Sequence, residues 1–348
     1  MKRLALVASA ALIVVLGAGV TATQVSAWGS TGHRMVGVAA MRALSDELPA
    51  FLRTPGAVAE VGELSREPDR TKGAGQPHDR ERDTAHFVDL DDDGHVMTSA
   101  GPTLAELPEL KSEYDALLLS AGIEVNDAGY LPYAIMDGFQ QLARDFATWR
   151  VLNAAEMRET DPGKKAWYRQ DRERRQALVL RDIGYLSHYI GDGAQPHHMS
   201  VHYNGWGQYP NPEGFTNSRQ THGAFEGAFI RRNMRLDAVE AAMPEPNLDG
   251  FELRARMATY LTTTASQVVP FYRLEKTGAF AADADGAVLA SGAEFATVRL
   301  AAGAGELRDL ITLAWRAAGE QSIGWPAVKV AEVEAGAADP WLAMIGED

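Results

Sequence analysis

Histidine and acidic residues recur at metal-binding spacing in two parts of the sequence. His188 and Asp192 are four residues apart in a stretch with helical periodicity, so both side chains project from one helix face and can reach one cation. Pro196 ends that helix and lets His198 return from the following loop. His222 and Glu226 repeat the spacing in a second predicted helix. Imidazole and carboxylate are the ligands that zinc takes when thiolate is unavailable, so the sequence predicts a zinc site.

Each pair also has an ordinary interpretation. A histidine and an acid at helical spacing often form only an exposed hydrogen-bonded pair. Apolar neighbours such as Ile190 and Phe225 instead indicate buried surroundings, where a carboxylate needs a partner. His197 competes with His198 for the ligand position, and the ten-residue spacing from His188 favours His198.

Composition limits what else the protein can do. The chain has 348 residues, of which 46% are hydrophobic, and it contains no Cys. This excludes a disulfide scaffold, a Cys-ligated zinc site and a thiol nucleophile. With 33 basic and 47 acidic residues the net charge is −14, so no generic attraction to nucleic acid or anionic lipid is expected. An anionic substrate needs a local cationic site, which metal ions can supply.

The amino-terminal segment 1–27 has the pattern of a secretory signal. Lys2 and Arg3 precede an uncharged run over 4–20, and Ala27 offers a small residue for cleavage. The competing interpretation is a retained amino-terminal anchor. We expect cleavage after Ala27, a secreted or periplasmic protein that begins at Trp28, and no stable membrane insertion afterwards.

Helical periodicity dominates the remaining chain and predicts a single, mainly α domain over 28–348. A short hairpin is expected over 87–96, and Gly/Pro-rich loops are expected over 66–83, 199–219 and after 324. The arginine-rich run 171–175 is interpreted as a solvated helix face. From about 240 to 348 we expect a helical extension whose role the sequence does not indicate. The predicted helices are 32–44, 130–158, 165–190, 220–235, 251–269 and 294–318.

These motifs resemble a known superfamily. The segment 188–198 and the His222/Glu226 pair resemble bacterial zinc-dependent phospholipases C, whereas the start, Trp28-Gly-Ser-Thr-Gly-His33, resembles single-strand-specific zinc nucleases. The two groups share an α-helical fold and a cluster of three zinc ions. The resemblance covers 28–226 and implies a zinc-dependent phosphodiesterase.

The resemblance also implies a ligand role for nine residues around three zinc ions. Trp28 would bind through its α-amine and carbonyl. Asp69 would in addition be a possible proton acceptor, and the adjacent Arg70 would contact phosphate or form a surface salt bridge. The implied sets are Trp28, His33 and Asp192; Asp69, His86, His188 and bridging Asp192; and His198, His222 and Glu226.

The residues near these ligands indicate which class of substrate the protein cleaves. Thr31 and Arg70 stand where the phospholipases carry residues that bind a quaternary ammonium group, which disfavours that pocket. Phe87 and Asp89 follow a ligand histidine as in the nucleases, where such residues stack and hydrogen-bond a base. Glu226 and the absence of Cys are, in contrast, phospholipase-like.

We therefore expect a single-strand endonuclease that cleaves DNA or RNA with metal-activated water. The alternatives are a phospholipase C that acts on phospholipid head groups, and a non-catalytic exported binding protein stabilised by zinc. No protein partner is predicted.

Overall fold

The computed structural model describes residues 28–73, 75, 77–281 and 289–346. The predicted signal segment 1–27 lies outside the described residues. No described helix combines the length and the apolar character that crossing a bilayer requires.

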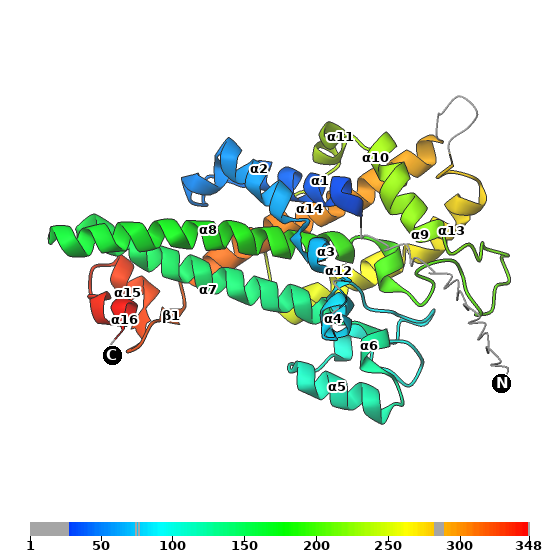
Figure 1. Ribbon diagram of the computed structural model, residues 1–348, viewed down its shortest axis with the longest axis horizontal. Helices are drawn as coiled ribbons and strands as arrows, with labels where there is room; N and C mark the ends of the chain where they lie inside the picture. The colour runs from blue at the N-terminus through cyan, green and yellow to red at the C-terminus, as the bar shows by residue number, and fades with distance from the viewer. Residues whose placement is uncertain (1–27, 74, 76, 282–288, 347–348) are drawn as a thin grey trace, which may run out of the picture.

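Two long antiparallel helices form the spine of the molecule: α7 (Leu131–Arg158) and α8 (Pro162–Gly193) lie side by side over most of their length (Figure 1). The Asp161 side chain accepts a hydrogen bond from the backbone N–H of Lys164 and caps α8, whose first residue is a proline. Apolar residues at helical spacing along α7, including Ile135, Phe139 and Leu142, are buried. This pairing holds the carboxyl-terminal end of α8 in the middle of the fold.

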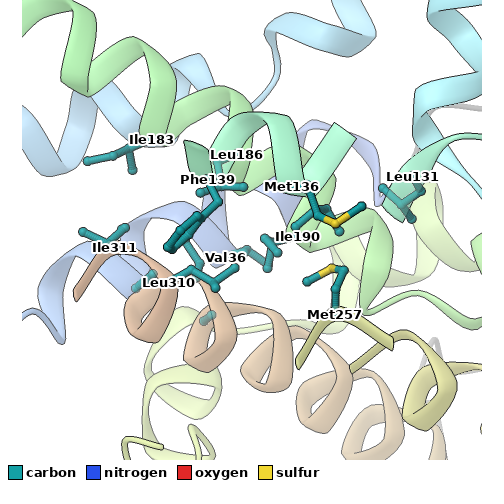
Figure 2. Close-up of a cluster of buried hydrophobic side chains, with 14 of the residues drawn as sticks. Val36, Leu131, Met136, Phe139, Ile183, Leu186, Ile190, Met257, Leu310 and Ile311 are labelled. Atoms are coloured by element: carbon teal, nitrogen blue, oxygen red, sulfur yellow. The ribbon is translucent and has the colours of Figure 1, made fainter. Parts of the chain in front are cut away.

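The core lies where three further helices pack against this spine. They are α1 (Gly29–Arg42), α12 (Leu253–Ala265) and α14 (Ala290–Ala318). Figure 2 shows Val36 of α1, Ile190 of α8 and Leu310 of α14 converging on one cluster, and all three are fully buried. Each buried side chain of this size stabilises the fold by about 1.5–3 kcal/mol. The region beyond residue 240 thus contributes α14 to the same core that contains α1 and α8.

Shorter elements complete the described chain, which is mainly helical and confirms the predicted class. The strands β1 (Ser322–Ile323) and β2 (Val328–Lys329) form one antiparallel pair. The remaining helices are α2 (Pro55–Leu64), α3 (Glu67–Thr71), α4 (Asp79–Asp83), α5 (Lys111–Ser120), α6 (Val125–Ala128), α9 (Thr221–Gly223), α10 (Ile230–Asn233), α11 (Leu236–Ala241), α13 (Val268–Lys276), α15 (Val330–Glu334) and α16 (Trp341–Ile345).

The expected helix 220–235 is confirmed, since α9, a π-helical turn over Ala224–Phe229 and α10 follow one another without a break. Three other local predictions were wrong. The segment after 324, expected to be a loop, contains β2, α15 and α16. The expected hairpin over 87–96 is reduced to a single bridge between Leu90 and Val96. The segment 66–83 contains α3 and α4 besides its loop, because Pro68 lies in the first turn of α3, where its missing N–H costs nothing.

Candidate metal centre

The last turns of α8 carry the centre of the site. His188 and Asp192 are fully buried one turn apart, and His188 Nε2 lies 3.2 Å from Asp192 Oδ2. The Nδ1–H of His188 donates to the backbone carbonyl oxygen of Ser65 at 2.8 Å. This bond turns Nε2 toward the carboxylate and orients the ring as the partners of metal-ligating histidines do.

Three other segments bring donors to this pair. From α1, His33 Nε2 lies 3.5 Å from Asp192 Oδ1 and 3.9 Å from an oxygen of Asp69, which belongs to α3. His86, at the end of a 3₁₀ turn, has its Nδ1 3.1 Å from Asp192 Oδ2 and 2.9 Å from His188 Nε2. Asp192 therefore faces these three histidines, and a fourth, His198, has its Nδ1 3.9 Å from Asp192 Oδ1.

The second predicted pair forms a neighbouring group. His222 Nε2 lies 2.7 Å and His198 Nε2 lies 3.1 Å from the same oxygen of Glu226. The Nδ1–H of His198 donates to the carbonyl oxygen of His86 at 2.6 Å, which ties this group to the first donors. The amide of Gln195 also donates to Glu226. Glu226 itself sits in the π-helical turn, a feature that often marks functional sites.

Together the eight predicted side-chain ligands form three groups. Within each group, the donor atoms lie within 4.8 Å of one another. The grouping differs from the expected one, since Asp69 joins His33 and His188 in one group. His188 belongs to two groups, so these two adjoin. The groups are His33, Asp69 and His188; His86, His188 and Asp192; and His198, His222 and Glu226.

Trp28 lies at the edge of this cluster. Its side chain is fully buried, and its indole N–H donates to the carbonyl oxygen of Gly191 at 2.5 Å. Gly29, at φ +51°, packs so closely that an added Cβ would lie 3.1 Å from the carbonyl oxygen of Glu226. The start of α1 therefore touches both α8 and the π-helical turn. The role of the Trp28 amine and carbonyl as metal ligands stays a prediction.

The electrostatics of the cluster fit a bound cation. Within the part of the chain that the structure describes, the buried polar atoms without a hydrogen-bond partner include both ring nitrogens of His33, Oδ1 of Asp192 and Oε2 of Glu226. Such atoms are costly unless something satisfies them. Burial lowers the pKa of His33 to about 3 and that of His86 to about 3, so both rings are neutral and keep a lone pair for coordination.

The carboxylates of the cluster favour positive charge. Burial opposes ionisation of Asp192, but His188 and His198 outweigh it and hold the pKa of Asp192 well below its usual value. His222 and His198 act in the same way on the pKa of Glu226. In turn Asp192 and Glu226 outweigh the burial of His198 and raise its pKa to about 9. Buried nitrogen and oxygen donors of this kind suit zinc and related divalent ions.

A cleft of about 570 Å³, here named the primary cleft, reaches this cluster at His198 and His222. Phe87 and Asp89, the predicted base-binding residues, both line it. Burial raises the pKa of Asp89 well above its usual value, and its Oδ1 has no hydrogen-bond partner among the described residues. Asp89 therefore offers a buried carboxyl group that binds a proton more readily than an exposed one.

The surroundings of Arg70 and His197 bear on the alternatives that the sequence left open for them. Arg70 is half exposed and pairs with Glu67 at 2.5 Å, which is the surface salt bridge considered as its alternative role. His197 is buried with its ring 4.2 Å from that of Phe271, and it belongs to none of the three donor groups among the described residues. The spacing argument for His198 over His197 agrees with this arrangement.

Sequence reasoning missed several residues around the cluster. Lys72 lines the primary cleft, and its positive charge helps to lower the pKa of His86 and partly opposes the raised pKa of His198. The sequence could have indicated this residue, because Lys72 lies three residues after the predicted ligand Asp69. Tyr203 and Tyr209, from the loop after His198, also line the cleft and are exposed. Nothing in their local sequence pattern distinguishes them from other surface tyrosines.

Comparison with protein-family models and with curated proteins found no match to this chain.

Proposed function

We propose that this protein is an exported, zinc-dependent phosphodiester hydrolase that cleaves single-stranded nucleic acid. The observation that carries the proposal is the convergence of seven buried histidine and carboxylate side chains and the partly buried Asp69 in three donor groups beside an open cleft. Each group offers three side-chain donors, and His188 is shared. Structural zinc sites normally have four protein ligands and no open position, so this arrangement favours catalysis over a purely structural role.

In this proposal the nine predicted ligands hold the metal ions. Bound zinc supplies Lewis acidity, which neutralises charge on phosphate oxygens and lowers the pKa of water. Asp69, at the edge of the cluster and 11% exposed, accepts a proton from the attacking water. Lys72 lines the cleft that reaches His198 and His222, and its ammonium group contacts a nonbridging phosphate oxygen.

The primary cleft supports a nucleic-acid substrate. A base that stacks on Phe87 would place a hydrogen-bonding edge near the Asp89 carboxyl group. The raised pKa of Asp89 favours its protonated form, and a protonated carboxyl group matches the mixed donor and acceptor edge of a base. Phosphate contacts from Lys72 add affinity without sequence preference.

A phospholipase C is the second candidate, and one observation favours it. Tyr203 and Tyr209 line the primary cleft together with Asp127, and aromatic rings beside a carboxylate suit a quaternary ammonium group. A choline head group would occupy the space that the first proposal gives to a base. A third candidate, a non-catalytic binding protein stabilised by zinc, predicts no turnover at all.

The test uses zinc-loaded protein that begins at Trp28. It is assayed side by side on bis(p-nitrophenyl) phosphate, single-stranded DNA, RNA and phosphatidylcholine vesicles. We expect hydrolysis of the chromogenic diester and of both nucleic acids, loss on chelation and recovery when zinc is restored. His222→Ala should abolish this activity, whereas His95→Ala, outside the three donor groups, should retain it.

The pattern of products separates the candidates. Turnover of phosphatidylcholine without turnover of nucleic acid would assign the phospholipase activity instead. Bound zinc with no turnover of any of the four substrates would contradict the catalytic proposal.

A further inference from the structure

A second cleft, of about 550 Å³, opens beside the primary cleft. The two clefts are separated by a ridge, defined as the segments 68–72 and 85–89. Thr71 and His86 line the second cleft, whereas their chain neighbours Lys72 and Phe87 line the primary cleft. The ridge is therefore only a residue or two thick, and nothing in the proposed function uses its far side.

The ridge contains metal-donor residues, which makes the position of the second cleft significant. Asp69 and His86 belong to the ridge and also to the donor groups. His86 forms part of the wall of the second cleft, and the ring of Tyr189, which lines the same cleft, lies 5.8 Å from the His86 ring. A phosphate bound at the donor groups thus has the primary cleft on one side and the second cleft on the other.

The lining of the second cleft combines three tyrosines with three cations and four carboxylates. The Lys111 ammonium lies 4.0 Å from the ring centre of Tyr130, and the Arg181 guanidinium lies 4.7 Å from that of Tyr185. Arg181 contacts Asp182 at 3.1 Å, yet its side chain stays 54% exposed. Tyrosine rings and guanidinium planes are surfaces on which bases stack, and the same cations attract phosphates.

The polar lining also argues against lipid in this cleft. In a phospholipase the leaving group carries acyl chains, which need an apolar surface. Besides Lys111 and Arg181, the charged side chains that line this cleft are Glu81, Arg82, Asp83, Asp137 and Asp182. Covering these charges with hydrocarbon would remove them from water without compensation. A nucleotide strand, by contrast, has polar groups to offer them.

We propose that the second cleft binds the nucleotides on the far side of the scissile phosphate, so that the substrate is a strand spanning both clefts rather than a single head group. This inference rests on the proposed function, because it assumes that the phosphate is cleaved at the donor groups. It adds a binding site for single-stranded nucleic acid in which Lys111 and Arg181 contact the strand.

The test compares the double variant Lys111→Gln/Arg181→Gln with the parent protein. Binding of a phosphorothioate oligothymidylate of about ten nucleotides, a length within the range of single-strand sites, is followed by fluorescence anisotropy. In parallel, kcat/KM is measured on single-stranded DNA, bis(p-nitrophenyl) phosphate and phosphatidylcholine vesicles. Lys164→Gln is the matched control, because Lys164 makes the same kind of contact, 4.8 Å from the Trp341 ring, and lines neither cleft.

We expect the double variant to bind the oligonucleotide about tenfold more weakly, which corresponds to about 1.4 kcal/mol. Its kcat/KM on DNA should fall by a similar factor, while hydrolysis of the small diester stays unchanged. The charge-conserving variant Lys111→Arg/Arg181→Lys should retain most of the binding, which shows that the loss does not come from misfolding.

Unchanged oligonucleotide binding in the double variant would overturn the inference. So would an equal loss on DNA and on the small diester, or a loss confined to phosphatidylcholine. If the parent protein hydrolyses none of the substrates, the proposed function fails, whereas the anisotropy measurement still decides whether the second cleft binds a strand.

Discussion

At the scale of single residues, His188 has the most connections in the site. Its Nε2 faces Asp192 and lies 2.9 Å from a nitrogen of His86, while its Nδ1–H is held by the Ser65 carbonyl. It belongs to two donor groups, whereas His222 belongs to one. Loss of its imidazole should therefore weaken more than one metal position.

We predict that His188→Ala lowers the zinc bound per molecule more than His222→Ala does. The reason is that His188 serves two adjoining groups, and even indirect ligand partners change metal affinity by roughly 10–100-fold. Zinc is measured by plasma mass spectrometry after gel filtration, with circular dichroism as the check on folding. His95→Ala is the control and should keep the full zinc content. Equal zinc in the His188 and His95 variants would contradict the assignment.

The sequence alone predicted part of this site. The pairs His188/Asp192 and His222/Glu226 followed from helical spacing, because both members of a pair lie on one helix. Asp69 and His86 had no such local pattern and entered only through the resemblance. Lys72 and the cleft tyrosines depend on how separate segments meet, which local periodicity does not report.

At the scale of elements, a buried carboxyl pair lies between α7 and α8. Asp145 and Asp182 are 2% and 6% exposed, and they share a hydrogen bond. Burial and this neighbour raise the pKa of Asp182 to about 8. Arg175 forms an ion pair with Asp145, so the run 171–175 is not wholly the solvated face that the sequence suggested. Below about pH 8 this carboxyl pair therefore favours one retained proton.

We predict that this pair makes stability fall as pH rises. The folded-state pKa of Asp182, about 8, exceeds the ordinary value of 3.8. The folded protein therefore holds a proton that the unfolded chain has released, and the associated stability is lost as the pH approaches and passes about 8. Asp182→Asn should remove this loss, on the order of 2 kcal/mol, since the half-exposed Arg181 screens part of the effect.

Urea unfolding at about pH 5 and about pH 9 measures this difference between variant and parent. Asp171→Asn is the control, because Asp171 lies on the same helix and forms an ion pair with Arg174, three residues along. Comparing each variant with the parent at each pH cancels the pH dependence of metal binding. A parent and an Asp182 variant with parallel pH profiles would refute the shared-proton interpretation.

Helix prediction succeeded where the apolar pattern was long and continuous, as in α7, α8 and α14. It missed α2, in which Gly56 and Gly62 dilute the pattern; Gly62 is needed because an added Cβ would lie 2.8 Å from the Val38 side chain. It also missed α5, which buries only Tyr114 and Leu118 and exposes Leu117 and Leu119. In both helices tertiary contacts decide the structure more than periodicity does.

At the scale of the whole molecule, the donor groups join segments that are remote in the sequence. Their residues come from α1, α3, α8, the π-helical turn and the short 3₁₀ and α segments beside them, so the cluster connects much of the chain. The chain has no Cys to provide a covalent connection, and its net charge of −14 opposes compaction. Cations bound at the donor groups would connect these segments and also neutralise part of the negative charge.

We therefore predict that chelation lowers the melting temperature by on the order of 10 °C or more. Without a cation, buried Asp192 and Glu226 keep unsatisfied oxygens, and a structural zinc site contributes roughly 10 kcal/mol to folding. For a domain of about this size each 1 kcal/mol shifts the midpoint by about 2–4 °C. Scanning calorimetry of zinc-loaded, chelated and re-loaded protein measures the shift, which should reverse on re-loading. The His188→Ala variant, already depleted of zinc, should respond much less to the chelator. If complete removal of zinc left the parent midpoint unchanged, the donor groups would be held together by packing alone.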